Sequence, residues 1–182
     1  MNGCILAGGK NSRMNYKIKA LLEYRGETFL ERISKVLDGL DKFIVTNNKE
    51  VSEGIEIPTY SDIIKDIGPM GGVYTALKVS SSERCMIVGC DMPFICRKLI
   101  GKVTSYEGYD VVVPRIEGQV ELLCAMYSKG CISVIEKLIE KKEYKLTLIL
   151  ERVRVKYVDL SRNELEYFIN INTPDDYKKL VK

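Results

Sequence analysis

The amino-acid sequence predicts an α/β fold with a mostly parallel sheet and helices on both of its faces. Short apolar runs, typical of buried strands, alternate along the chain with segments whose apolar residues recur at helical spacing. Polar or glycine-bearing loops follow several of these runs, and this alternation is typical of parallel sheets. The chain has 182 residues, of which 46% are hydrophobic, and is expected to form one domain over residues 1–182.

The first half of the chain begins with a strand, a helix and a second strand. The apolar run at residues 3–7 predicts a buried strand that leads into a loop. Apolar residues then recur at helical spacing after Thr28, the expected N-cap, and Gly39 ends this helix before a strand at residues 43–46. The same pattern next predicts a strand at residues 57–60, a helix at 70–79 and a strand at 85–89.

The second half is expected to add elements of the same kind. Residues 168–172 predict a short strand, and Thr173 follows as the N-cap of a helix with Pro174 in its first turn. Asp175 and Asp176 suit the positive end of that helix's dipole. Upstream of these residues, the pattern predicts strands at residues 110–114 and 121–127 and helices at 132–140 and 146–151.

Charge and hydropathy exclude several classes of protein. The formal net charge is only +3, and the lysines and arginines are spread along the chain, so no nucleic-acid partner is expected. No apolar run approaches the roughly 20 residues that a membrane helix needs. The sequence also starts without the features of a signal peptide. A cytoplasmic protein without a membrane partner is therefore expected.

The cysteine and histidine content narrows the possible chemistry. Six cysteines show no CxxC pair, and several stand in apolar runs, which predicts buried thiols rather than metal ligands. The sequence has no histidine, which excludes a histidine-based triad and histidine-ligated zinc. Any chemistry must use carboxylates, lysines and backbone groups.

A glycine-bearing loop after the first strand is a candidate phosphate site. Gly8 and Gly9 leave backbone amides open to an anion, and Arg13, Lys17 and Lys19 could neutralise a triphosphate. Lys19 directly precedes the apolar residues 20–22, where a strand would fix its position close to the loop. The loop matches neither the Walker pattern nor the dinucleotide-binding fingerprint. A plain tight turn with a solvated basic segment is the alternative.

Two aspartates follow predicted strands at the edge of the sheet where ligands usually bind. Asp91 stands just beyond the strand at residues 85–89, and one carboxylate with the oxygens of a triphosphate is an adequate Mg²⁺ site. Asp62 follows the strand at residues 57–60. A helix cap for Asp91 and a turn residue for Asp62 are the alternatives.

Two further motifs lie near the same edge. The segment Gly68-Pro69-Met70-Gly71-Gly72 precedes a helix, whose N-terminus could face an anion or a base, and its glycines allow close approach. Asn170 and Asn172 would share one face of a strand and present amide donors and acceptors. A simple helix entry and ordinary turn polarity are the alternatives.

The motifs, taken in their order along the chain, resemble those of the molybdenum cofactor guanylyltransferases. The resemblance spans nearly the whole chain and implies a single-domain, Rossmann-like nucleotidyltransferase fold of the nucleotide-diphospho-sugar transferase type. The matching residues are Leu6-Ala7-Gly8-Gly9 with Arg13, Met14 and Lys19, then Gly68-Pro69-Met70-Gly71-Gly72, then Asp91-Met92-Pro93, and last Asn170-Ile171-Asn172-Thr173-Pro174-Asp175.

The resemblance also implies residue roles. Arg13 and Lys19 would offset the charge of the departing pyrophosphate, and Asp91 would carry Mg²⁺. With Gly8, the loop resembles that of the guanine-using branch, because the cytidylyl branch tends to have Ala at this position. A residue without a side chain leaves room for the larger purine. The residues implied to bind the nucleotide are Leu6, Ala7, Gly8, Gly9, Lys19, Asp62 and Asp91, with Thr46 or Asn47 near the base or ribose.

The sequence departs from the family pattern at two places. Asn15 replaces the usual glycine after Arg-Met, and Asn is the non-glycine residue that best tolerates positive φ. Glu121-Leu122 replaces a His-Pro or similar pair before the substrate-side strand, which leaves open how the pterin is held. Lys10 and Lys17 receive no role from the resemblance.

The implied reaction is the transfer of GMP from GTP to molybdopterin, the pterin of the molybdenum cofactor, with release of pyrophosphate and with Mg²⁺ as cofactor. Transient contact with molybdoenzymes or their chaperones is a further implication. Two alternatives stay open: a cytidylyl- or sugar-1-phosphate nucleotidyltransferase on the same fold, and a non-catalytic GTP-binding module.

Overall fold

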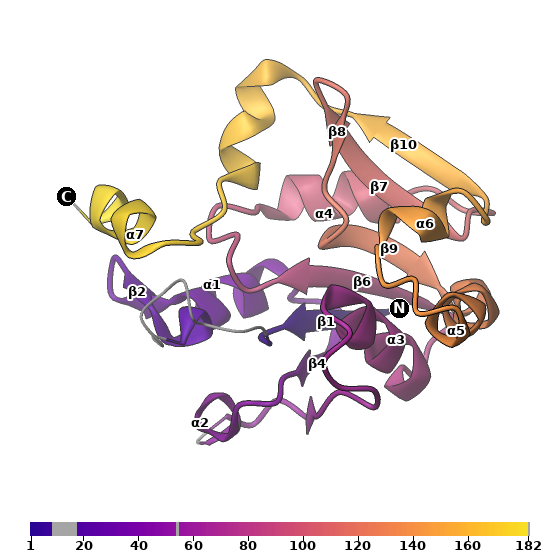
Figure 1. The fold of residues 1–182 in the computed structure, drawn as a ribbon. Coiled ribbons are helices and arrows are strands. Elements are labelled where there is room, and N and C mark those ends of the chain that lie inside the picture. Colours follow the sequence, from indigo (N-terminus) through magenta and orange to yellow (C-terminus); the bar gives the residue numbers. More distant parts are fainter. Residues whose placement is uncertain (9–17, 54, 182) are drawn as a thin grey trace.

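The computed structural model describes residues 1–8, 18–53 and 55–181, and its centre is one eight-stranded sheet (Figure 1). The strand order is β10-β7-β9-β6-β1-β4-β5, with β8 paired to β7. Strand β9 runs antiparallel to β6 and β7, and β8 antiparallel to β7, while the other pairs are parallel. The expected mostly parallel α/β fold is confirmed. The strands are β1 Asn2–Leu6, β4 Asp41–Val45, β5 Thr59–Tyr60, β6 Arg84–Gly89, β7 Val111–Ile116, β8 Gln119–Val120, β9 Cys124–Ser128 and β10 Val155–Asp159.

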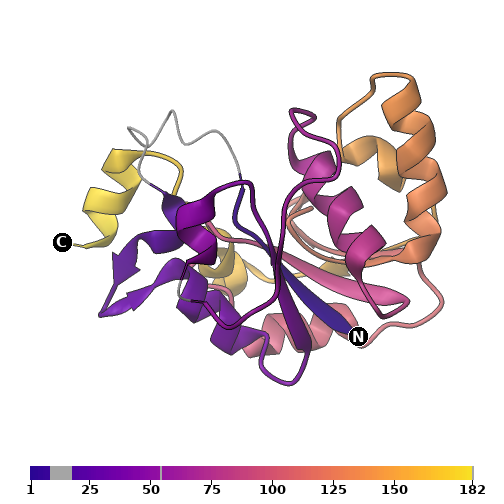
Figure 2. The same cartoon turned by 90° about the horizontal axis from the view of Figure 1, so that it is seen from below.

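Helices cover both faces of the sheet, as expected (Figure 2). Because side chains alternate along a strand, Cys4 joins the hydrophobic cluster under α3, α5 and α6, while Ile5 joins the cluster under α1 and α4. The helices are α1 Phe29–Val36, α2 Lys49–Ser52, α3 Pro69–Val79, α4 Arg97–Thr104, α5 Ile132–Glu140, α6 Thr147–Leu150 and α7 Pro174–Leu180, with 3-10 helices at Lys19–Leu21, Lys129–Cys131 and Arg162–Phe168.

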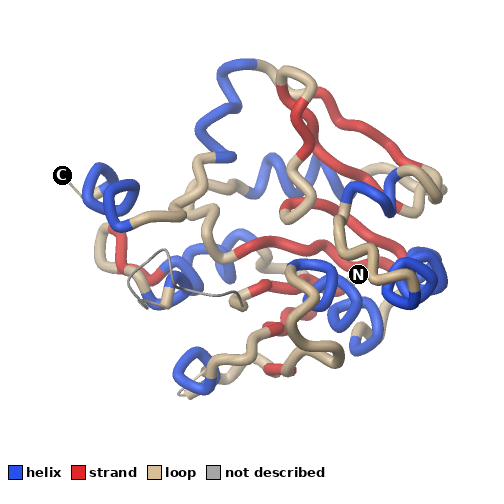
Figure 3. The backbone as a smooth tube through the Cα atoms, in the orientation of Figure 1, coloured by secondary structure: helices blue, strands red, loops and turns tan. Residues whose placement is uncertain are grey.

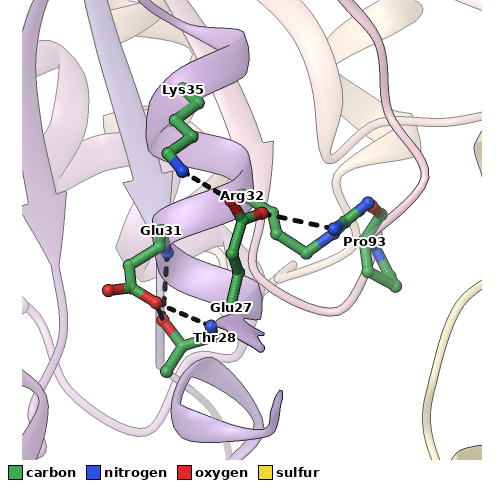
Figure 4. Close-up of polar contacts among 6 residues, drawn as sticks. All are labelled: Glu27, Thr28, Glu31, Arg32, Lys35 and Pro93. Carbon is green, nitrogen blue, oxygen red and sulfur yellow. Dashed lines mark hydrogen bonds and ion pairs between the residues drawn. The ribbon is translucent and has the colours of Figure 1, made fainter. Parts of the chain in front are cut away.

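Helix α1 begins where the sequence predicts. The Thr28 hydroxyl accepts from the backbone N–H of Glu31 at 3.2 Å, and the Glu31 carboxylate accepts from the Thr28 N–H at 2.7 Å (Figure 4). This reciprocal capping box satisfies two backbone donors that the first turn of a helix leaves without partners. A similar box at Thr173 confirms the predicted start of α7.

The C-terminal segment packs against a small hairpin near the N-terminal end of the chain. Strands β2, Glu23–Tyr24, and β3, Glu27–Thr28, form this hairpin. The Tyr177 hydroxyl of α7 donates to the Glu23 carbonyl at 2.8 Å, and Ile171 packs with Leu22 and Phe29. The C-terminal segment thus lies beside residues 22–29, which are distant from it in the sequence.

Three predicted strands differ from the structure. Residues 168–172 are not a strand: the 3-10 helix ends at Phe168, and a loop leads from there to α7 (Figure 3). Residues 121–123 also lie outside β9, because the Cys124 N–H bonds back to the Glu121 carbonyl at 3.3 Å and forms a turn. Residues Lys19–Leu21 form a 3-10 helix where a strand was expected. The elements that were not predicted are the hairpin β2–β3, the strands β8 and β10, helices α2 and α4, and the 3-10 helices at Lys129–Cys131 and Arg162–Phe168.

The cysteines are core residues, as expected. Five are buried and Cys96 is half-buried, and all six are free thiols. Burial raises the pKa of Cys85, Cys90 and Cys131 to about 12, so these thiols stay protonated at neutral pH. Within the described residues, no helix has both the length and the apolar character needed to cross a membrane.

Candidate active site

The carboxyl ends of β1, β4 and β6 meet at one edge of the sheet. In the parallel pairing, Leu6 at the end of β1 lies opposite Val45 of β4 and Gly89 of β6. The loops that follow these strands therefore leave the sheet at the same level. They carry Gly8, Asn47 and Asp91, which places the predicted site residues at the edge where ligands bind open α/β sheets.

Lys19, Asp91 and Asn172 form a polar cluster at this edge. The Lys19 ammonium donates to Asn172 Oδ1 at 2.6 Å and lies 3.4 Å from Asp91 Oδ2. The side chains of Lys19 and Asp91 are 19% and 23% exposed, so both are open to a ligand without being free in solvent. The structure thus brings together a cation and a carboxylate that the sequence assigned to one site.

The turn that carries Asp91 is braced from three directions. The Cys90 N–H donates to the Leu6 carbonyl at 3.0 Å, and the Ile171 N–H donates to the Asp91 carbonyl at 2.9 Å. Helix α1 adds a third contact, because Arg32 Nε donates to the Pro93 carbonyl at 3.3 Å (Figure 4).

Asp91 is therefore fixed through its neighbours. Helix α4 begins at Arg97 with Cys96 as its N-cap, so Asp91 does not cap the helix that follows it, and the capping alternative falls away.

Arg32 is a positioning residue that the sequence did not reveal. Its guanidinium also pairs with Glu27 at 3.3 Å, and the same carboxylate bonds to Lys35 (Figure 4). In the sequence, Arg32 is one of several polar residues on an amphipathic helix, and nothing local distinguishes it.

Leu6, Ala7 and Gly8 differ in what they offer a ligand. The Leu6 side chain is 8% exposed, and a Cβ on Gly72 would lie 3.2 Å from it, so Leu6 packs under α3. The Ala7 N–H donates to the Val45 carbonyl at 2.9 Å, so that donor is already used in the sheet. Gly8 is exposed, and no atom of the described residues lies within 4 Å of the position that a Cβ would take there. Gly9 and Arg13 lie outside the described residues, as do Lys10, Asn15 and Lys17.

Gly71 and Gly72 lie inside α3, which begins at Pro69 within the predicted motif, and they serve close packing within the protein. A Cβ on Gly71 would lie 2.6 Å from the Ile64 carbonyl oxygen, well inside van der Waals contact. Gly68, the N-cap of α3, has φ +66°, a conformation that favours glycine.

Asp62 lies in the loop just after β5 and is hydrogen-bonded to Asn47. Asn47 Nδ2 donates to Asp62 Oδ2 at 2.7 Å, and the Asp62 N–H donates to Asn47 Oδ1 at 3.0 Å. Asp62 Oδ1 is buried without a hydrogen-bond partner in the described part of the chain, and burial raises the pKa of this carboxyl. Thr46 is buried, and its hydroxyl donates to the Ala7 carbonyl at 2.9 Å. Asn47 and Asp62, rather than Thr46, are thus available at this edge.

A groove with a volume of about 510 Å³ lies between the β7–β8 hairpin and the 3-10 helix Arg162–Phe168. Glu121 and Asn170 are its polar residues nearest the cluster, and Asn170 Nδ2 lies 3.5 Å from Glu121 Oε2. Asn170 is two residues from Asn172, so one short segment joins the groove to the Lys19 cluster. Because that segment is not a strand, the two asparagines do not share a strand face as predicted. Asn170 contacts Glu121, and Asn172 contacts Lys19.

The residues present fit a magnesium ion bound largely through a ligand. In residues 1–8, 18–53 and 55–181, no group of three or more Cys, Asp or Glu side chains is placed to hold a metal ion. Asp91 supplies one hard carboxylate, and Mg²⁺ is commonly held by one or two carboxylates together with substrate phosphates and water. Asp91 is thus able to contribute one ligand to an ion that phosphates also hold.

Comparison with known proteins gives the family. The family model described as the MobA-like NTP transferase domain matches residues 3–156, which is most of the chain. The chain belongs to the MobA-like NTP transferase family. It is a nucleotidyltransferase, and the resemblance inferred from its motifs is confirmed.

Relatives of this MobA-like protein match over nearly full length. A probable molybdenum cofactor guanylyltransferase of Clostridium perfringens is 34% identical, with 100% of this chain and 96% of the relative covered. One of the same name from Pelotomaculum thermopropionicum is 37% identical, with 97% and 90% covered. Among solved structures, molybdopterin-guanine dinucleotide biosynthesis protein A of Archaeoglobus fulgidus is 25% identical, with a TM-score of 0.85 and 100% and 97% covered.

Proposed function

We propose that this MobA-like protein transfers GMP from GTP to molybdopterin, forming the guanine dinucleotide of the cofactor and releasing pyrophosphate. The observation that carries the proposal is the cluster of Lys19, Asp91 and Asn172 at the carboxyl ends of β1 and β6. A cation and a carboxylate held together at this edge suit a triphosphate with its metal ion. The guanine and pterin specificities are proposed from the full-length relatives.

In the proposed reaction, the terminal phosphate of molybdopterin attacks the α-phosphorus of GTP. A new P–O bond forms, the bond from the α-phosphorus to the bridging oxygen of the β-phosphate breaks, and pyrophosphate leaves with that oxygen. The attacking phosphate is already anionic at neutral pH, so no general base is needed, which suits a chain without histidine. Positioning and charge neutralisation then supply most of the acceleration.

Lys19 and Asp91 have different electrostatic roles in this reaction. Lys19 is held by Asn172 at 2.6 Å, close to where phosphates would lie, and offsets charge that grows on the departing pyrophosphate. Asp91 contributes a carboxylate ligand to Mg²⁺, which when bound neutralises charge on the phosphate oxygens. Arg13 and the glycines at positions 8 and 9 are proposed to add donors to the triphosphate.

Base specificity is the sharpest test of this function. The purified protein is given molybdopterin with GTP, CTP, UTP or ATP at equal concentrations, and pyrophosphate release is measured with Mg²⁺. GTP should give the highest rate. A higher rate with CTP or UTP would contradict guanylyl transfer and favour the cytidylyl or sugar-phosphate alternative. GTP binding without any product would favour the non-catalytic module.

The same proposal has consequences for location and partners. A nucleotidyltransferase that uses GTP is proposed to work in the cytoplasm, where the nucleotide is made. Transient contact with molybdoenzymes or their chaperones is proposed as the route by which product leaves. Both follow from the reaction, and fractionation and crosslinking of cells that produce the protein would test them.

A further inference from the structure

The groove beside the Lys19 cluster holds polar atoms that the contacts within the protein leave incompletely used. Glu121 Oε1 accepts from the Leu123 N–H at 3.1 Å, and Oε2 has a long contact of 3.5 Å to Asn170 Nδ2. A carboxylate can accept about four hydrogen bonds, so each oxygen keeps accepting capacity. Asn170 Oδ1 is buried and has no hydrogen-bond partner in the part of the chain that the structure describes.

Leaving such atoms without donors is costly, which points to a ligand. Burial raises the pKa of Glu121, and the nearby charge of Asp91 acts in the same direction. A buried acceptor that lacks a donor keeps its desolvation penalty without compensation. A ligand that brings two or three N–H donors on one edge would recover this cost.

The lining of the groove suits a heterocycle. Apolar side chains line the groove together with the polar pair: Val120 from the β8 hairpin, and Leu165 and Ile169 from the 3-10 helix and its exit. Leu165 and Ile169 are 43% and 48% exposed, so they offer apolar surface to a ligand in the groove. A groove lined by apolar side chains together with carboxylate and amide acceptors is a site for a ring with a donor edge.

We propose that Glu121 determines specificity for the acceptor by accepting hydrogen bonds from the ring N–H and the exocyclic amino group of its pterin, with Asn170 Oδ1 as the neighbouring acceptor. This inference rests on the proposed function, because that function supplies a pterin as the acceptor. It assigns a role to the residue at which the sequence departs from the family pattern. The pterin's side-chain phosphate would then extend along residues 170–172 toward Lys19 and Asp91.

Two fluorescent probes isolate the donor edge from the rest of the acceptor. One is a pterin monophosphate with its phosphate on the 6-side chain, and the other is the matching lumazine monophosphate, in which oxygen replaces the 2-amino group. Wild-type protein should bind the pterin at least about tenfold more tightly, because lumazine presents a carbonyl to the Glu121 carboxylate. Fluorescence titration gives both dissociation constants without GTP or turnover.

The decisive variant is Glu121→Gln, with Glu107→Gln as its control. Glutamine keeps the acceptor for the Leu123 N–H but replaces one carboxylate oxygen by a donor, so the preference for pterin over lumazine should fall to within about twofold. Glu107 is exposed and lies outside the groove, so its variant loses the same charge and should keep the preference. GTP affinity and the thermal midpoint, measured for each variant, should stay at wild-type values.

The outcomes separate this inference from the proposed function. If Glu121→Gln retains the wild-type preference for pterin, Glu121 does not read the donor edge and the inference is wrong, whatever the enzyme's activity. If wild-type protein binds neither probe and releases no pyrophosphate from GTP with molybdopterin, the proposed function itself fails. Loss of preference in Glu121→Gln alone, with GTP binding intact, supports both.

Discussion

The Lys19 ammonium and the Asn172 amide oxygen are 2.6 Å apart, although 153 positions separate them in the sequence. The contact holds Lys19 where it can also reach Asp91 at 3.4 Å. Because Asn172 is neutral, it orients the cation without cancelling its charge, whereas a carboxylate at this position would compete with phosphate. Asn172 is therefore a positioning residue for Lys19.

Removing the lysine should weaken nucleotide binding. For Lys19→Ala, we expect GTP affinity to fall by about 1.5–3 kcal/mol, the range for hydrogen bonds to a charged group, which is roughly 10- to 150-fold. Isothermal titration of GTP with Mg²⁺ measures this loss. Lys178→Ala is the control, because Lys178 is exposed and pairs with Asp175 on α7. Unchanged GTP affinity and turnover would remove Lys19 from the site.

Coupling between Lys19 and Asn172 can be measured separately. We expect Asn172→Ala to weaken GTP binding less than Lys19→Ala does, and to add little in the double variant, because its effect acts through the lysine. A double-mutant cycle on GTP affinity should then give a coupling energy of about 1 kcal/mol. Strictly additive losses would show that Asn172 contacts substrate independently.

Asp91 should be responsible for the metal requirement. Asp91→Asn keeps the size of the side chain but loses the charge that attracts Mg²⁺, so turnover should become very low and should no longer rise with Mg²⁺. Pyrophosphate release across a Mg²⁺ titration measures this, with Asp175→Asn on exposed α7 as the control. If the variant retains metal-dependent turnover, another residue is the ligand.

Two helical glycines should respond to alanine in opposite directions. A Cβ on Gly71 would lie 2.6 Å from the Ile64 carbonyl, so Gly71→Ala should lower the free energy of unfolding by about 1–3 kcal/mol. Gly101 lies in α4, where a Cβ would meet no atom of the described residues within 4 Å, so Gly101→Ala should raise it by about 0.5–1 kcal/mol. Urea unfolding of both variants tests the pair, and a shift of the same sign in both would contradict the packing argument.

Asp110 should make folding stability depend on pH. Hydrogen bonds from Arg154, including its N–H at 3.0 Å and Nε at 3.1 Å, lower the pKa of the Asp110 carboxyl in the folded chain. A carboxyl with a lowered folded pKa stabilises the fold above its unfolded value, about 3.9, and this contribution is lost as pH falls through the folded pKa.

The measurement for Asp110 is the free energy of unfolding between pH 7 and pH 2. Wild-type protein should lose about 1 kcal/mol more than Asp110→Asn over this range, since the amide does not titrate. If both proteins lose the same amount, the carboxyl does not contribute to the pH dependence.

The sequence predicted those elements whose signals are local. The capping residues Thr28 and Thr173 marked the starts of α1 and α7, because the partners of a cap lie within one helical turn. The central strands β1 and β6 were equally clear, since a strand buried on both faces is apolar at nearly every position. Asp91 could be placed because it follows the central strand β6, whereas Lys19 was assigned from the basic loop and from the apolar residues that follow it.

The signals that failed depend on contacts distant in sequence. Residues 168–172 alternate like a strand, yet Ile169 borders the groove while Ile171 packs with Leu22 and Phe29, so two separate environments produced the alternation. Glu121 gave no local sign of its place, because its partners come from the turn before β9 and from the loop before α7. Tertiary contacts overrode the local pattern at both places.

The contact between α7 and the β2–β3 hairpin is a weak point of the site. No residue of α7 is fully buried, so this helix is held by few contacts, and such elements open at a smaller free-energy cost than the sheet does. We expect such an opening to disturb the contact between Asn172 and Lys19, because the Asn172 N–H donates to Asp176 Oδ2 of α7 at 3.1 Å, while the strands beneath stay paired. On heating, nucleotide binding is therefore expected to be lost at a lower temperature than that at which the protein unfolds.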